Sequence, residues 1–194
     1  MKRIFLLYAI LAIGIGTASA QQTQQSKTTS QLFVEANDLF RKEKYAVAQY
    51  LFDRYLDCND ATEQVDATYY AAVCSQQLRN DDALFRLNEF LRLYPESGRV
   101  NMARLALGNV YFDNAEWNNA LHEYLQVEPS EVEFNHRSEF EYKTGFCYFQ
   151  QGDKENAKKY FKRVADGKSY YKNAATYSYA DILFSAGQYE SADK

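Results

Sequence analysis

The chain has 194 residues, of which 22 are basic and 26 are acidic, and its formal net charge is −4. This acidic balance disfavours binding to nucleic acid, whose phosphates require a basic surface. The sequence has only eight Gly and two Pro and no stretch that alternates like a half-buried strand, so it predicts an all-α fold.

The first 20 residues have the pattern of a secretory signal peptide. Two basic residues precede an apolar run over residues 4–16, and small residues then lead to Ala20. The run is short for a transmembrane helix. We therefore expect cleavage after Ala20 and an exported, periplasmic chain with no integral membrane span, associated with the outer membrane only through partners.

A polar segment follows the cleavage site. Residues 21–30 contain no apolar side chain, and such a segment has nothing to contribute to a core. We expect a flexible polar linker over 21–30 and a helical repeat domain over 31–194.

One constellation of residues recurs five times in this domain: a small residue, an apolar or aromatic residue three positions later, an Ala nine further on, and an aromatic or Leu four after that. The copies are Ala36, Leu39, Ala48 and Phe52; Ala71, Cys74, Ala83 and Leu87; Gly108, Tyr111, Ala120 and Tyr124; Gly145, Tyr148, Ala157 and Phe161; and Ala180, Leu183 and Ala192. The alanines that anchor the copies are separated by 35, 37, 37 and 35 residues. Such a period is typical of helical-hairpin arrays.

Within each copy, the small residue and the Ala lie on two successive helices. We expect them to face each other where the two backbones approach most closely. An aromatic residue three positions before the Ala, as at Tyr45, Trp117 and Tyr189, is expected to wedge the turn between the helices. The repeat units are predicted near 29–62, 64–97, 101–134, 138–171 and 173–194, the last being incomplete.

These residues resemble the tetratricopeptide repeat, as found in bacterial periplasmic and cell-envelope proteins. Pro95 lies 12 residues after Ala83, where that family has a Pro, and the second and third copies match the pattern best. The resemblance implies an α-solenoid of stacked antiparallel helix hairpins in a right-handed superhelix, with about four and a half repeats.

The sequence offers little catalytic or metal chemistry. His122 and His136 are the only histidines, and neither has the spacing of a metal ligand. Ser130 and Glu133 have the spacing of a capping box at a helix start, which accounts for the acidic residues nearby. We therefore expect no catalytic residue, no metal site and no cofactor.

The three cysteines are expected to be free. A disulfide between Cys58 and Cys74 would need their α carbons within about 7 Å, and their predicted helical positions disfavour this. We expect all three, Cys147 included, to be buried thiols that act as small apolar residues.

The resemblance also implies a concave groove, lined by the first helix of each repeat, that binds a peptide or a partner helix. Carried over by position, the groove residues are Phe33, Asn37, Phe40, Leu105, Asn109, Phe112, Tyr142, Phe146, Phe149, Tyr177, Asp181 and Phe184. Most are aromatic, and aromatic side chains contribute large areas to interfaces. The groove lacks the lysines of the family members that clamp a terminal carboxylate, so a clamp of that kind is not expected.

The expected function is a non-catalytic scaffold for protein–protein interaction in the bacterial cell envelope, with envelope proteins or peptides as partners. One alternative is a glycan-binding envelope module. Another is the solenoid part of a larger envelope enzyme, with its catalytic domain beyond residue 194. Because the fifth copy stops just after Ala192, we expect either a longer protein or end-to-end self-association through the last repeat.

Overall fold

The computed structural model describes residues 28–58 and 62–187, and these contain helices and no strand. The first helix spans residues 28–41. The others are α2 (Tyr45–Asp57), α3 (Gln64–Gln77), α4 (Ala83–Leu93), α5 (Val100–Asp113), α6 (Trp117–Tyr124), the 3-10 turn η1 (Pro129–Glu131), α7 (Phe134–Gln150), α8 (Lys154–Ala165) and α9 (Lys172–Ser185). The predicted all-α fold is confirmed, whereas the predicted signal peptide lies outside the described residues.

The chain divides into two compact units, residues 1–78 and 79–194. In the first unit, the helix of residues 28–41, α2 and α3 share one core. This core contains the small residues of the repeat pattern and large side chains from α2: Ala36, Ala48, Phe52, Tyr55, Ala67, Ala71 and Cys74. Phe52, Tyr55 and Cys74 are fully buried, so the apolar faces of all three helices meet.

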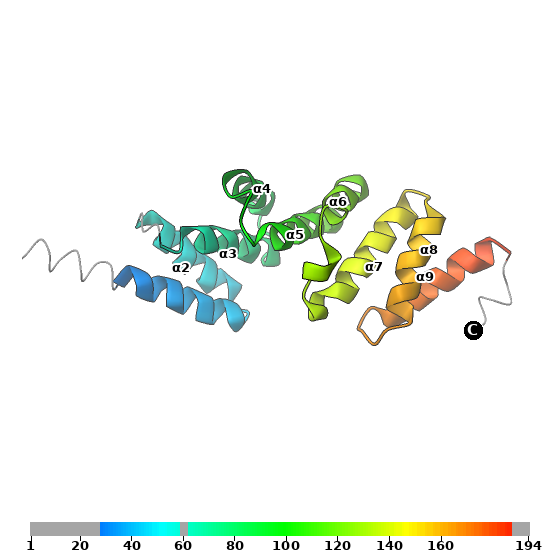
Figure 1. Cartoon of the computed structure of the whole chain (residues 1–194). Helices are drawn as coiled ribbons and strands as arrows, with labels where there is room; N and C mark the ends of the chain where they lie inside the picture. Colours follow the sequence, from blue (N-terminus) through cyan, green and yellow to red (C-terminus); the bar gives the residue numbers. More distant parts are fainter. Residues whose placement is uncertain (1–27, 59–61, 188–194) are drawn as a thin grey trace, which may run out of the picture. The chain divides into compact units, whose positions relative to one another are not determined.

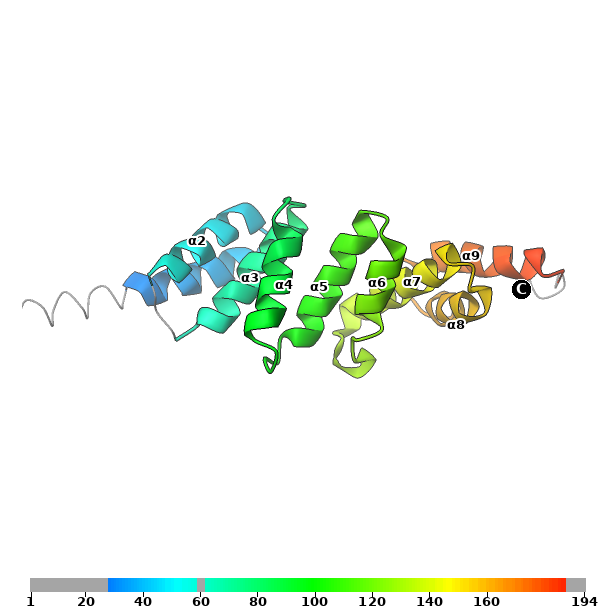
Figure 2. The same cartoon turned by 90° about the horizontal axis from the view of Figure 1, so that it is seen from above.

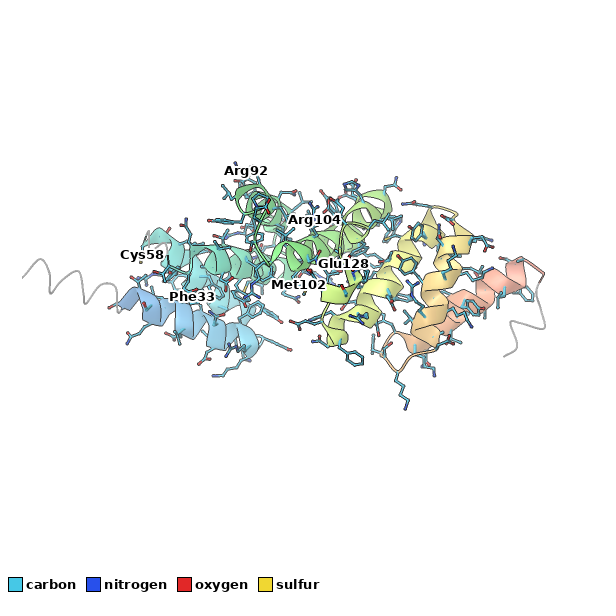
Figure 3. All side chains as sticks on the ribbon, in the orientation of Figure 1. Phe33, Cys58, Arg92, Met102, Arg104 and Glu128 are labelled. Atoms are coloured by element: carbon cyan, nitrogen blue, oxygen red, sulfur yellow. The ribbon has the colours of Figure 1, made fainter. Side chains whose placement is uncertain are left out.

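The second unit contains α4 to α9, and each of these helices packs on the next one in the chain. The antiparallel pair α7 and α8 is seen in Figure 1, and the pair α5 and α6 in Figure 2. Met102 of α5 packs against the core that α5, α6 and α7 share, and Arg104 of the same helix donates to Glu123 of α6 at 3.0 Å (Figure 3). A second core, around Phe161, joins α8 to α9.

The small residue of each copy gives the helices their close approach, as predicted, but its nearest neighbour differs from the prediction. A Cβ placed on Gly108 would lie 2.4 Å from Cε1 of Tyr124, and one placed on Gly145 would lie 2.8 Å from Cβ of Tyr160. The contact at Gly108 is therefore with the aromatic ring four residues after Ala120. Ala120 itself is fully buried, as the repeat pattern predicts.

The turn inside each hairpin passes through a residue with a left-handed backbone. These residues are Glu43 (φ 58°), Arg79 (φ 56°), Ala115 (φ 59°), Gly152 (φ 81°) and Gly187 (φ 72°). They follow the same period as the anchoring alanines. Just after two of these turns, Tyr45 and Trp117 begin α2 and α6 and pack edge-on against Phe40 and Phe112, as predicted for aromatic wedges.

Three local features differ from the sequence prediction. The first helix begins at residue 28, inside the segment expected to be linker, and Thr29 is buried. The predicted capping box is wrong: the Ser130 hydroxyl donates to Glu128, and Glu133 precedes α7 without a capping hydrogen bond. The reason is that Pro129 starts a separate 3-10 turn, so Ser130 lies outside α7.

Candidate protein-binding surface

The predicted groove residues of α5 and α7 lie in one half-buried row. Phe112 contacts Phe146 with ring centroids 5.5 Å apart, and both contact Trp117, at 5.2 and 5.3 Å. Phe149 is also half-buried and lies 6.4 Å from the ring of Phe161. Leu105 is buried in the core of α5, α6 and α7, so it supports the row from beneath. The structure thus brings together the aromatic residues predicted on two successive first helices.

A chain of polar contacts runs beside this row. The Tyr124 hydroxyl and the Lys143 ammonium group both donate to Oδ1 of Asn109, each at 2.9 Å. Lys143 also pairs with Glu139 at 2.6 Å, and the hydroxyl of Tyr171 bonds to the same carboxylate. We call these five residues the polar chain. Because Asn109 lies on α5, Lys143 on α7 and Tyr171 directly before α9, the polar chain fixes three successive hairpins in one register.

Burial governs the electrostatics of the polar chain. It raises the pKa of Tyr171 to about 12, with the Glu139 carboxylate as the next cause, and it also raises the pKa of Tyr124. Both hydroxyls therefore remain protonated donors at neutral pH. The side chain of Lys143 is only 12% exposed, and its ammonium group lies 5.2 Å from the centre of the Phe112 ring. That ring contributes a cation–π contact to a charge already paired with Glu139.

Aromatic contacts continue from α7 to α9. The ring of Tyr142 stacks on Tyr171 with centroids 5.2 Å apart and also contacts Phe161 and Phe146. The hydroxyl of Tyr142 bonds to Ser178 of α9. Tyr142 is thus held on two sides by the helix that follows α7.

The predicted groove residues of the first unit pack closely on their own core. Phe33 (Figure 3) contacts Phe52 and Tyr55, and Phe40 contacts Tyr70 of α3 at 4.8 Å. The amide of Asn37 donates to the carbonyl oxygen of Phe33. All three predicted residues are half-buried.

The three predicted residues on α9 differ from the others in exposure. Tyr177 is 76% exposed, Phe184 is 64% exposed, and Asp181 between them is also exposed. They lie at intervals of four and three residues, so they form one stripe along the helix. We call Tyr177, Asp181 and Phe184 the α9 stripe.

The cysteines are all free, as predicted, but their burial differs. Cys74 and Cys147 are fully buried, and burial raises the pKa of each thiol to about 12. Neither is ionised at neutral pH, so neither is a ready nucleophile. The prediction of burial is wrong for Cys58, which caps the C-terminus of α2 and donates to the carbonyl oxygen of Arg54 at 3.3 Å (Figure 3).

Sequence reasoning missed Lys143, Glu139 and Tyr171. Lys143 lies two residues before Gly145, a place where the other copies have Val34, Tyr69, Ala106 and Ser178. No shared residue type marks that place, so the repeat pattern gave no signal for it. The charge of Lys143 one turn after Glu139 was the only hint in the sequence.

Within residues 28–58 and 62–187, no group of three or more His, Cys, Asp or Glu side chains is arranged to hold a metal ion. The same residues include no helix that is both long enough and apolar enough to cross a membrane.

Comparison with known proteins bears on the fold. The family profile of the tetratricopeptide repeat matches residues 66–97 and 140–166. These segments are the second and fourth copies. The third copy, expected to match well, is not matched, and its second helix, α6, has only eight residues. No curated protein matches the chain significantly.

Solved structures resemble the chain over most of its length. MamA of AMB-1 has a TM-score of 0.67 at 15% identity, covering 85% of this chain and 86% of MamA. PilF of Pseudomonas aeruginosa has 0.61 at 15% identity, covering 87% of this chain and 73% of PilF. RapI in its apo form has 0.62 at 13% identity, covering 83% of this chain and 49% of RapI. Taken with the two matched segments and the recurring buried alanines, this likeness identifies the chain as a tetratricopeptide repeat protein.

Proposed function

We propose that the chain is a non-catalytic scaffold of the bacterial cell envelope that binds a segment of another protein along the first helices of its repeats. The row of half-buried aromatic side chains on α5 and α7, with the polar chain beside it, is the observation that carries this proposal. Aromatic groups that are already fixed in position lose little conformational entropy on binding. Such a row suits an extended segment or a helix with apolar side chains.

The envelope location rests on the first 20 residues. A basic start, a short apolar run and the small residues up to Ala20 support export through a cleaved signal peptide. The test is the mass of the protein recovered from the exported fraction of a bacterial culture. A chain that begins at Gln21 supports the location, whereas an uncleaved chain found only inside the cell overturns it.

Binding is best tested without truncating the row, because Phe112 and Phe146 also hold α5 and α7 together. A photo-crosslinking benzoylphenylalanine is introduced at Phe149 of α7, and a matched one at Phe85 of α4, which is 67% exposed. Crosslinks to a defined envelope protein from position 149, but not from position 85, would support the proposal. Equal capture from both positions, or none from either, would count against it.

A glycan-binding role is the second candidate. Tyr170 is 92% exposed and Tyr177 is 76% exposed, and exposed tyrosine rings can stack on sugars. Retention of the chain on envelope glycans, lost when both tyrosines are replaced with Ala, would favour this candidate over protein binding.

A further inference from the structure

The α9 stripe matches, in register, residues that earlier repeats bury against their next helix. Counted from the small residue of each copy, Asp181 and Phe184 occupy the places of Asn109 and Phe112. The contacts of Asn109 and Phe112 are therefore a guide to what the stripe can bind.

In the interior of the second unit, one lysine serves both of these places. Lys143 of α7 donates to Asn109 at 2.9 Å and lies 5.2 Å from the centre of the Phe112 ring. Three residues later on the same face of α7, Phe146 contacts Phe112. A following helix that carries a Lys and an aromatic residue three positions apart thus satisfies both an oxygen acceptor and an aromatic ring.

Two other junctions repeat the aromatic part of this arrangement. Phe40, at the place of Phe184, contacts Tyr70 of the next first helix at 4.8 Å. Tyr142, at the place of Tyr177, stacks on Tyr171 directly before the next first helix. Aromatic residues at these places receive an aromatic partner in both units.

We propose that the α9 stripe docks an amphipathic helix of another protein, which presents a Lys or Arg to Asp181 and an aromatic side chain to Phe184. The inference rests on the proposed role in protein binding and names one surface and one kind of partner for it. Asp181 is exposed and, among the residues that the structure describes, forms no ion pair. A carboxylate there attracts a cation more strongly than the amide oxygen of Asn109 does.

The charges disfavour a second copy of this chain as the occupant. The helix of residues 28–41 carries Glu35 and Asp38 among its exposed residues, and these would repel Asp181. Two copies that met through α9 would bring two Asp181 carboxylates into one interface, which like charges also disfavour. A basic helix has no such penalty.

The probe for this site is the 17-residue peptide of α7, residues 134–150, labelled with fluorescein, because it carries Lys143 and Phe146 at the required spacing. Its binding to the whole chain is measured by fluorescence anisotropy. We expect Asp181→Lys to weaken binding about tenfold, as loss of one charge-assisted contact does. The peptide with Lys143→Glu should lose binding to the unaltered chain and regain it with Asp181→Lys.

Restored binding in the double charge exchange supports the site. Failure of the unaltered chain to bind the peptide, or equal binding by the Asp181→Lys variant, overturns it. Since Asp181 is exposed, far-UV circular dichroism should show an unchanged fold in the variant. If sedimentation shows a dimer that Asp181→Lys dissociates, the occupant is a second copy and the inference is wrong. Specific crosslinking from position 149 without peptide binding to α9 would refute this site alone and leave the proposed function standing.

Discussion

Replacing Gly108 with Ala tests the close approach of α5 and α6. The new Cβ would lie 2.4 Å from Cε1 and 2.6 Å from Cδ1 of Tyr124. Carbon atoms in contact lie about 3.5 to 4.0 Å apart, so the ring or a helix would have to move by roughly 1 Å. The ring is only 1% exposed, its hydroxyl donates to Asn109, and Phe140 packs edge-on against it at 5.8 Å.

The expected magnitude follows from three terms. Ala is a better helix former than Gly by about 1 kcal/mol, which favours the variant. Overpacking costs about 1 to 3 kcal/mol, and weakening the hydrogen bond to Asn109 costs about 0.5 to 1.5 kcal/mol. We therefore expect Gly108→Ala to lower the free energy of unfolding by about 1 to 3 kcal/mol.

The assay is urea unfolding followed by circular dichroism at 222 nm. Gly98→Ala is the matched control, because a Cβ at Gly98 would meet nothing within 4 Å, and its effect should stay within about 0.5 kcal/mol. In the background of Tyr124→Leu, the cost of Gly108→Ala should shrink, because the two sites are coupled by contact. If Gly108→Ala proves as stable as the unaltered chain, the overpacking argument is refuted.

Further predictions concern the core and the thiols. Phe161→Ala should lower the free energy of unfolding by about 3 to 5 kcal/mol, because this ring is fully buried; the exposed Phe85→Ala, measured by the same urea titration, should change it by less than about 0.5 kcal/mol. In the folded chain, a maleimide should label Cys58 rapidly, and mass spectrometry should find Cys74 and Cys147 unlabelled until urea is added. Burial raises the pKa of both buried thiols from 9.0 to about 12. Their contribution to stability is therefore complete below pH 9 and should decline as the pH rises toward about 12. Urea midpoints under reducing conditions that rise over this pH range would contradict the assignment.

The repeat architecture was predictable because it depends on side-chain volume. Ala48, Ala120 and Ala157 lie where two helices leave room for one methyl group, and all three are fully buried. A bulkier residue at any of these places would separate the helices, so the period is visible in the sequence. The burial of Phe52 and Phe161 follows from the same spacing.

The arrangement of the candidate surface was less predictable because it depends on contacts between successive repeats. Phe112 and Phe184 occupy equivalent places, yet Phe112 is half-buried against Phe146 while Phe184 is 64% exposed. The period contains no information about which helix covers which ring. The position of Lys143 is likewise set by two acceptors, Asn109 and Glu139, that lie on different helices.

The left-handed turns have a practical consequence for engineering. The first three turns place Glu43, Arg79 and Ala115 at positive φ, where only the later turns have Gly. An L residue with a side chain is strained in this conformation, and Gly is not, so each replacement with Gly should raise the melting temperature through a gain of about 0.5 to 1 kcal/mol. Because the stability of a repeat array is nearly a sum of local terms, heat resistance could be adjusted hairpin by hairpin, while the side chains of the α9 stripe and the polar chain stay as they are.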